Sequence, residues 1–128
     1  MSDRVSPESN PIYTTRLSDL LDMAPAKSKP EGRKDDTDKL PWHLLPSESV
    51  EAILQVMQFG ADKYGERNWE KGMAWSRVFS ALMRHMWAWW RGEPHDAETG
   101  YSHLAHAGCC ILFLLSYEIN GMGDDNRN

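Results

Sequence analysis

Two short motifs in this chain each place a pair of reactive side chains three residues apart. One is Glu48-x-x-Glu51 and the other is His103-x-x-His106. Residues three apart on a helix share a face, so each pair can reach a single cation. Paired carboxylates suit Mg²⁺, and imidazoles combined with carboxylates suit Mn²⁺, Fe²⁺ or Zn²⁺. Each pair also fits a structural role, the glutamates as a solvated first helical turn and the histidines as a hydrogen-bonded contact inside a bundle.

Further charged and aromatic residues lie near these motifs. Asp96 and Glu98 come just before the histidine pair, and four of the five histidines fall between positions 85 and 106. Asn68-Trp69 offers an amide and an indole that can bind a nucleobase. Cationic side chains that can bind phosphate follow the glutamate pair: Lys63, Arg67, Arg77, Arg84 and Arg91. The last three are seven residues apart, so they also fit a solvated stripe on one helix.

Helical periodicity predicts three long helices in the second part of the chain. We expect them at about residues 47–64, 76–91 and 99–120, with Ser47, Ser76 and Thr99 as N-caps. Residues 1–38 are predicted to be an irregular N-terminal arm, with one candidate short helix over residues 15–23. Residues 121–128 are predicted to be a polar, frayed tail. No segment alternates as a strand would, so the predicted fold class is all-α.

The three predicted helices carry more apolar surface than one small core can bury. Trp87, Trp89 and Trp90 are therefore expected in the core or at a subunit interface. We predict a helical bundle that is completed by oligomerisation.

Composition excludes several classes of protein. The net charge of −5 argues against a nucleic-acid binder, which usually has a basic face. Cys109 and Cys110 are adjacent, so they form no disulfide framework, and the N-terminus does not have the pattern of a signal peptide. The longest apolar run, residues 107–115, is too short to span a membrane. We expect a cytoplasmic protein with no membrane or nucleic-acid partner. The sequence has no phosphate-binding glycine loop, no nucleophile elbow and no paired CxxC motif.

Three segments, together with the glutamate pair, resemble the phage dATP/dGTP diphosphohydrolase family. They read KLPWHLLP at residues 39–46, FGADKYGERNW at residues 59–69 and RHMWAWWRGEPHDAETGYSHLAHA at residues 84–107. The resemblance covers about residues 33–117, and it is specific because the motifs are long and occur in the same order. This family is grouped with the MazG-like all-α pyrophosphohydrolases and includes the MazZ type. The resemblance implies a MazG-like domain over residues 39–120.

The wider MazG-like group binds Mg²⁺ with an ExxE pair on one helix and an ExxD pair on a later helix. Glu48 and Glu51 match the first pair. The second pair falls on His103 and His106, so this chain departs from the parent pattern, and either Mg²⁺ or Mn²⁺ is expected. Asp96 and Glu98 can restore the missing negative charge. The resemblance implies a metal-ligand set that is drawn from these residues: Glu48, Glu51, Asp96, Glu98, His103 and His106.

The implied reaction converts a nucleoside triphosphate and water into a nucleoside monophosphate and diphosphate. Metal-activated water attacks the α-phosphorus, and cationic groups neutralise the departing diphosphate. Glu48, Glu51 and Lys63 are the expected catalytic residues. The expected substrate-binding residues are Lys39, Trp42, Lys63, Asn68, Trp69 and Arg84.

The resemblance favours a purine deoxynucleotide, with dGTP first and dATP or a broad dNTP preference as alternatives. In phages that use 2-aminoadenine, the dGMP product feeds synthesis of the modified nucleotide, so the host cytoplasm is the expected location. A homodimer or homotetramer is expected. Two other interpretations stay open. An HD-type phosphohydrolase would use the His95-Asp96 dipeptide, and a non-catalytic helical assembly protein would use the tryptophans as its interface.

Overall fold

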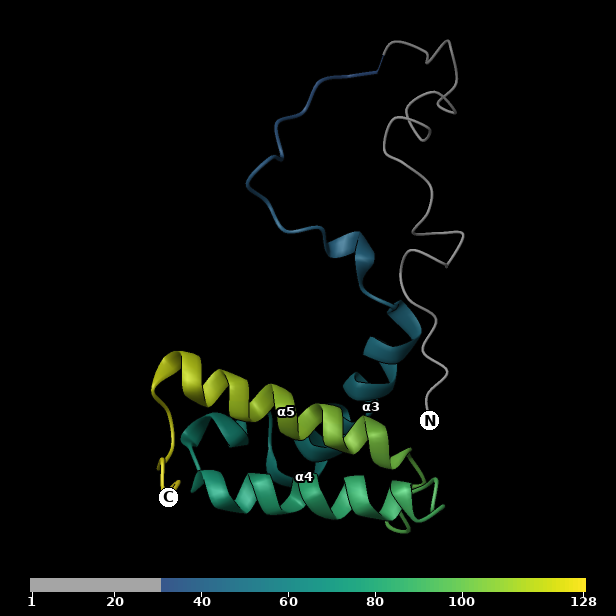
Figure 1. The fold of residues 1–128 in the computed structure, drawn as a ribbon, viewed down its shortest axis with the longest axis vertical. Coiled ribbons are helices and arrows are strands. Elements are labelled where there is room, and N and C mark those ends of the chain that lie inside the picture. The colour runs from purple at the N-terminus through teal and green to yellow at the C-terminus, as the bar shows by residue number, and fades with distance from the viewer. Residues whose placement is uncertain (1–30) are drawn as a thin grey trace, which may run out of the picture. The chain divides into compact units, whose positions relative to one another are not determined.

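The computed structural model describes residues 31–128, and the candidate helix over residues 15–23 lies outside them. Residues 31–40 contain a turn, closed by a hydrogen bond from the Lys39 amide to the Asp36 carbonyl, and no helix. Residues 41–128 form one compact unit that contains every helix of the described chain. Figure 1 shows these helices along the chain.

Three α-helices and two short 3₁₀ helices make up this unit. In chain order they are η2 (Trp42–Leu44), α3 (Ser47–Tyr64), η3 (Asn68–Lys71), α4 (Trp75–Trp90) and α5 (His103–Asn120). Residues 31–128 contain no strand and only two isolated bridges, which pair Ala74 with Asp124 and His95 with Ser102. The all-α prediction is therefore confirmed for the part of the chain that the structure describes.

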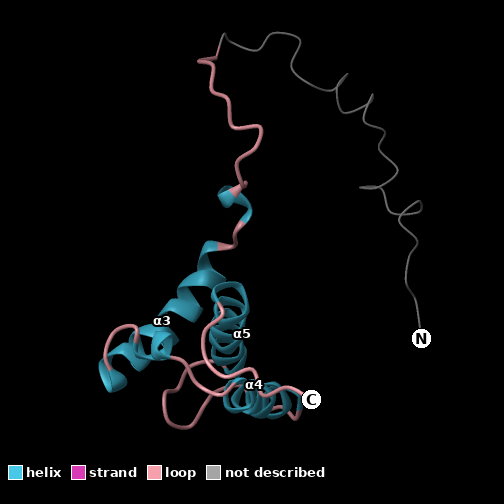
Figure 2. Ribbon diagram, turned by 90° about the vertical axis from the view of Figure 1, so that its left-hand side faces the viewer, coloured by secondary structure: helices cyan, strands magenta, loops and turns pink. Residues whose placement is uncertain are grey.

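Helix α5 is central, because it packs against both α3 and α4 (Figures 1 and 2). Small side chains on α5 let the neighbouring helices approach closely. At Gly108 the approach is close, since a Cβ atom there would lie 2.7 Å from Cδ1 of Ile53 on α3. A small core forms at this crossing from Val56, Ala105 and Cys109. Most of the buried residues belong to α5.

All three predicted helix N-caps are wrong. Helix α4 begins at Trp75 rather than after Ser76, and α5 begins at His103 with Ser102 as the cap, whose side chain accepts the Leu104 amide at 3.1 Å. The hydroxyls of the two predicted caps have other partners. That of Ser76 accepts a hydrogen bond from the Asn126 side chain, and that of Thr99 donates one to Asp96. Ser47 is the first residue of α3 and does not cap it. The C-terminal ends of α3 and α5 fall at the predicted residues.

The C-terminal tail docks onto the start of α4, so the prediction of a frayed tail is wrong. The Trp75 amide donates to the Asp124 carbonyl at 2.9 Å, and the Asp124 amide donates to the Met73 carbonyl at 3.1 Å. The Trp75 indole donates to the Met122 carbonyl at 2.8 Å. The Arg127 guanidinium lies 4.7 Å from the centre of the Trp75 ring. The polar residues of the tail therefore have specific partners.

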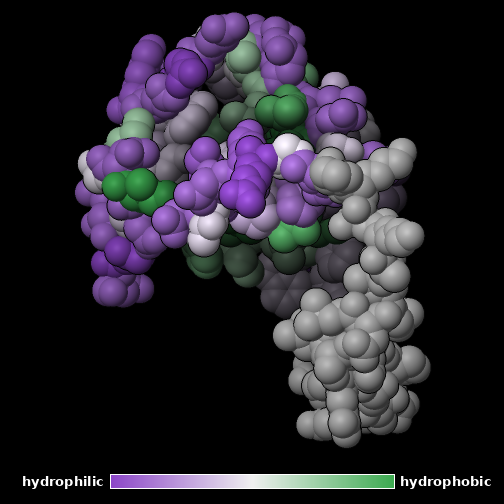
Figure 3. All heavy atoms as spheres, turned by 90° about the horizontal axis from the view of Figure 1, so that it is seen from above, coloured by the Kyte–Doolittle hydropathy of each residue, from purple (hydrophilic) through white to green (hydrophobic). Residues whose placement is uncertain are grey.

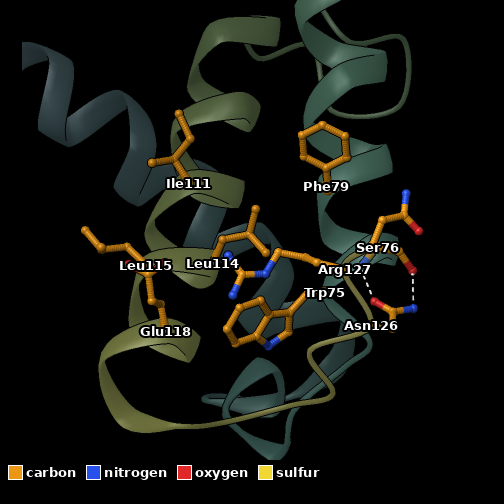
Figure 4. A pocket seen from close by; sticks show the side chains of 10 residues that line it. Trp75, Ser76, Phe79, Ile111, Leu114, Leu115, Glu118, Asn126 and Arg127 are labelled. Atoms are coloured by element: carbon orange, nitrogen blue, oxygen red, sulfur yellow. Dashed lines mark hydrogen bonds between the residues drawn. The ribbon is translucent and has the colours of Figure 1, made fainter.

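A groove runs between α4 and α5 beside this tail. It has a volume of about 620 Å³, and Figure 4 shows the apolar side chains of both helices around it. Its apolar lining comes from Trp75, Phe79, Ile111, Leu114 and Leu115. Glu118 and Arg127 add charged groups to its lining, with Arg127 lying between Leu114 and Trp75 (Figure 4).

Much of the apolar surface stays exposed in the single chain. Trp87 and Trp90 are 53% and 72% exposed, and Ile119 is 71% exposed. Figure 3 shows apolar patches among polar side chains on one face. These tryptophans therefore lie outside the core of the single chain, and their place at a subunit interface stays a prediction. No helix in residues 31–128 is both long and apolar enough to cross a membrane.

Candidate metal centre and active site

The segment between α4 and α5 folds back to present Asp96 beside the start of α5. The Asp96 amide donates to the Tyr101 carbonyl at 2.8 Å, and the Gly100 amide donates to the Asp96 carbonyl at 2.7 Å. Gly100 has a φ of 75°, which glycine adopts without a steric penalty. The His103 amide donates to the Pro94 carbonyl at 3.1 Å. This turn fixes the Asp96 side chain against the first turn of α5.

Thr99 holds the Asp96 carboxylate in place. Its amide and its hydroxyl both donate to Oδ2 of Asp96, at 3.0 and 3.1 Å. Burial raises the pKa of Asp96, but the Thr99 hydrogen bonds and the nearby histidines outweigh it, so the pKa lies below its usual value. Asp96 is therefore a carboxylate at neutral pH.

Three imidazoles surround this carboxylate. His85 of α4 places its Nδ1 2.9 Å from Nδ1 of His103 on α5. The His85 ring also stacks on the His106 ring, with centroids 4.5 Å apart and an interplanar angle of 11°. His106 Nε2 lies 2.7 Å from the Thr99 hydroxyl. Burial lowers the pKa of His85 and His106, which keeps both rings neutral at pH 7.

Glu93 fixes the orientation of His103. Its Oε2 lies 2.9 Å from Nε2 of His103, whose side chain is 6% exposed. The Nδ1 atom of His103 then points at the cluster. A carboxylate behind the outer nitrogen of a histidine is the usual way in which proteins orient metal-ligating imidazoles.

His85, Asp96 and His103 form a possible metal-binding group. One ligand atom from each residue lies within 4.8 Å of the others. Two imidazole nitrogens and one carboxylate oxygen are a donor set that suits a divalent transition metal. The residues therefore fit a metal ion. Of the six predicted ligands, Asp96 and His103 belong to this group. His85 belongs to it as well, but it was not a predicted ligand.

Lys63 and Glu98 form an ion pair at the edge of the same region. Nζ of Lys63 lies 2.6 Å from Oε1 of Glu98, and both side chains are largely exposed. The pair joins the end of α3 to the segment before α5. The hydrogen bond to Glu98 raises the pKa of Lys63, so this lysine stays positively charged. Exposure means that the pair contributes little to stability.

Glu48 and Glu51 lie on exposed turns of α3. The face of α3 that packs on α5 carries Ala52, Ile53 and Val56, whereas Glu51 lies on the other side of the helix. From Glu51 to Lys63 there are twelve residues of helix, or about 18 Å along the axis. In a single chain, Glu51 and Lys63 therefore lie on different turns of α3, about 18 Å apart along its axis.

The predicted substrate-binding residues are also spread out. Arg84 is exposed on α4 next to His85, and Trp42 in η2 is 74% exposed. Lys39 belongs to residues 31–40 and is not placed relative to the helices. Arg84 is the residue before His85, and Lys63 contacts Glu98, two residues after Asp96.

Asn68 and Trp69 belong to η3, which packs near the other end of α5. The Trp69 ring stacks on Phe113 at 4.5 Å and 12°, and the Trp69 carbonyl accepts the Tyr117 hydroxyl at 2.6 Å. Phe113 is ten residues beyond His103, or about 15 Å along the helix. Trp69 therefore packs within the helical unit, away from the histidine cluster.

Sequence reasoning missed three residues of the cluster. They are His85, Glu93 and Thr99, whose hydroxyl donates a hydrogen bond to Asp96. The concentration of histidines between positions 85 and 106 was the available signal. The His95-Asp96 dipeptide does not act as a unit here. Asp96 joins the cluster, while His95 is exposed and its backbone pairs with Ser102.

The fold and the site define an all-helical protein with an imidazole–carboxylate group that can hold a metal ion. Comparison with known proteins matches residues 29–127 to the family described as dATP/dGTP diphosphohydrolase, N-terminal. The chain belongs to this family, which confirms the resemblance seen in the motifs.

One relative is the dATP/dGTP diphosphohydrolase of Salmonella phage PMBT28. It is 33% identical over 96 residues, which make up 75% of this chain and 33% of that protein. The chain thus spans about a third of the length of this relative. No solved structure matches the chain.

Proposed function

We propose that this chain is a metal-dependent purine dNTP pyrophosphohydrolase that favours dGTP. It converts dGTP and water into dGMP and diphosphate. Family membership over residues 29–127 carries this proposal, because the matched region contains both the glutamate pair and the histidine cluster. The name of the phage relative supports a purine deoxynucleotide as the substrate. A dATP preference and a broad dNTP preference are the alternatives within the same activity.

The reaction needs a nucleophilic oxygen and a stabilised leaving group. Mg²⁺ or Mn²⁺, when bound, lowers the pKa of a water ligand and neutralises phosphate charge. Glu48 and Glu51 hold the ion as hard oxygen ligands. The oxygen of water forms a bond to the α-phosphorus, the bond from that phosphorus to the bridging oxygen breaks, and diphosphate leaves. Lys63 and Arg84 bind phosphate oxygens, and Lys63 must exchange its contact with Glu98 to do so.

The separation of Glu51 and Lys63 supports a site shared between subunits. About 18 Å of helix divides them in one chain, farther than a triphosphate reaches. A two-fold contact between α3 helices that run in opposite directions would place Glu51 of one chain opposite Lys63 of the other. We propose a MazG-like homodimer or homotetramer, whose subunits cover the exposed apolar faces.

In a phage that uses 2-aminoadenine, this reaction would supply dGMP for synthesis of the modified nucleotide in the host cytoplasm. The proposal rests on the phage source of the relative.

Product analysis tests the activity directly. The full chain is incubated with each dNTP and NTP in turn, with Mg²⁺ or Mn²⁺, and the products are separated by chromatography. We expect dGMP and diphosphate from dGTP. The appearance of no monophosphate from any nucleotide contradicts the proposal, and release of triphosphate or orthophosphate favours an HD-type phosphohydrolase.

Mixing two inactive variants tests the shared site. Glu51→Gln and Lys63→Ala are each expected to be inactive alone. If the two residues act across a subunit interface, mixed dimers regain one intact site, and about a quarter of the wild-type activity returns after subunit exchange. No recovery would contradict a site formed by two chains.

A further inference from the structure

We propose that His85, Asp96 and His103 form a binding site for a transition-metal ion such as Mn²⁺ or Fe²⁺, separate from the glutamate pair of α3. The inference stands on the contacts of these residues and does not depend on the proposed reaction. It assigns His85 as a ligand and Glu93 as the residue that positions His103.

The hydrogen bond of His103 to Glu93 determines which nitrogen is available. When Nε2 donates its proton to Oε2 of Glu93, at 2.9 Å, the neutral ring carries its lone pair on Nδ1. That lone pair points at Nδ1 of His85. If Nδ1 of His85 also carried a lone pair, the two lone pairs would repel each other at 2.9 Å. Either a proton or a cation must therefore lie between the two nitrogens.

The two imidazole nitrogens that face each other are close enough to share one ion. Nδ1 of His85 and Nδ1 of His103 are 2.9 Å apart. With metal–nitrogen bonds of about 2.1 Å, two ligands of one ion lie about 3.0–3.4 Å apart, so the rings need to separate only slightly to bind it together.

Asp96 completes the donor set on one side of the ion. Both hydrogen bonds from Thr99 go to Oδ2, which leaves Oδ1 open to a cation. Asp96 ligand atoms lie within 4.8 Å of those of both histidines. Two imidazoles and one carboxylate leave three positions for water or a ligand, the arrangement typical of iron(II) and related ions.

Mg²⁺ is a poor match for this group. It prefers oxygen ligands and gives up its water reluctantly, whereas imidazole nitrogen suits Mn²⁺, Fe²⁺ and Zn²⁺. The exposed Glu48 and Glu51 offer only oxygens, so they suit Mg²⁺. The two places in the chain should therefore differ in the ion that they select.

Electron paramagnetic resonance of bound Mn²⁺ separates the two sites. The full chain is first saturated with Mg²⁺, and Mn²⁺ is then titrated while the signal of free Mn²⁺ is followed. Pulsed measurements on the bound ion detect coupling to ¹⁴N, which imidazole ligands produce and carboxylates do not. We expect about one bound Mn²⁺ per chain with nitrogen coupling. The readout is independent of nucleotide hydrolysis, so failure of the activity leaves the site proposal testable.

Variants assign the nitrogen ligands. His85→Ala should weaken Mn²⁺ binding at least tenfold and reduce the nitrogen coupling, and Glu93→Gln should weaken it about 10- to 100-fold. His95→Ala, which changes an exposed histidine nearby, and Glu51→Gln should change neither. Circular dichroism checks folding, and Asp96→Asn serves as a second test if His85→Ala does not fold, because it removes the ligand oxygen and can keep the Thr99 contacts.

Two outcomes overturn the proposal. One is that the wild-type chain binds no Mn²⁺ in excess Mg²⁺, which would assign the histidines to a hydrogen-bonded structural cluster. The other is that the nitrogen coupling survives in both His85→Ala and Asp96→Asn, or disappears in Glu51→Gln.

Discussion

Thr99 links the acidic and the imidazole parts of the candidate site. Its hydroxyl lies 3.1 Å from Oδ2 of Asp96 and 2.7 Å from Nε2 of His106. One small side chain therefore fixes a carboxylate from the loop and a ring from α5. Without it, the half-buried Asp96 and His106 would lose partners in a region where water cannot fully replace them.

Replacing Thr99 should cost stability. Thr99→Val keeps the shape of the side chain but removes the hydroxyl, and we expect the free energy of unfolding to fall by about 1–3 kcal/mol. Urea denaturation followed by circular dichroism measures the change. Thr99→Ser, which keeps the hydroxyl, is the control and should lose less. Equal stability of Thr99→Val and the wild type would show that the two contacts contribute nothing.

Glu51 should matter for activity and not for folding. Glu51→Gln removes the charge of a proposed metal ligand, and we expect kcat for dGTP to fall at least about 100-fold. The melting temperature should stay near that of the wild type, because the side chain is exposed. Gln55→Ala changes the next turn of the same exposed face of α3 and should keep full activity. A fully active Glu51→Gln variant would remove the glutamate pair from the mechanism.

The two cysteines should be inert in the folded protein. Burial raises the pKa of Cys109 to about 12, and burial also raises the pKa of Cys110. At pH 8 roughly one Cys109 thiol in ten thousand is a reactive thiolate. Ellman's reagent should therefore label neither cysteine until urea is added. Rapid labelling of the native chain at pH 8 would contradict the burial of this part of α5.

At the scale of the elements, local patterning predicts the helices themselves, but it does not predict the N-terminal ends of α4 and α5. Apolar residues at helical spacing predicted α3, α4 and α5 within a few residues. Ser76 and Thr99 looked like caps, but each hydroxyl bonds a residue distant in sequence or outside the helix, Asn126 and Asp96 respectively. Such tertiary partners leave no periodic signal in the sequence, which is also why the docked tail was expected to fray.

The same limit applies to the site. His103 and His106 lie on the same helix, so their spacing predicted that both side chains share one face of α5. The contact of His103 with His85 joins residues 18 apart on two helices, and it depends on how α4 packs on α5. Helical spacing relates residues of one helix only, whereas the structure combines single residues from α4, the following segment and α5.

The docked tail depends on glycine at position 123. Gly123 has a φ of 73°, and a Cβ there would lie 2.5 Å from the Met73 carbonyl oxygen. We expect Gly123→Ala to lower the free energy of unfolding by more than about 2 kcal/mol, through both strain and overlap with backbone. Gly121→Ala also has a positive φ, 64°, but has open space around it, so it should lose only about 1 kcal/mol. Thermal unfolding of the two variants makes the comparison, and equal losses would argue against the docked tail.

At the scale of the whole molecule, the buried core is small for the amount of apolar surface. Six hydrophobic residues are buried in the described chain, while many large ones stay exposed. The groove between α4 and α5 concentrates several of them, with Phe79 54% and Ile111 50% exposed. Exposed apolar patches of this kind mark places where a protein partner, a membrane or a ligand binds, and we propose a second subunit here.

A charge in this groove should separate the subunits. We expect Ile111→Asp to reduce the size of the assembly by removing the contact made through this groove, because burying an unpaired carboxylate in an apolar interface is costly. Sedimentation velocity over a range of concentrations measures the change. Ser80→Asp places the same charge at an exposed polar position of α4 and should leave the oligomer intact. A wild-type chain that sediments as a monomer at every concentration would contradict the proposed assembly.

The small core of the single chain affects how an assay behaves with time and dilution. If folding and assembly are linked, the free energy of unfolding depends on chain concentration, and a diluted sample loses folded protein as well as subunit contacts. Specific activity would then fall at low enzyme concentration and would decay with time after rapid dilution. Rates for this chain are therefore best compared at a fixed concentration, after the sample has reached equilibrium.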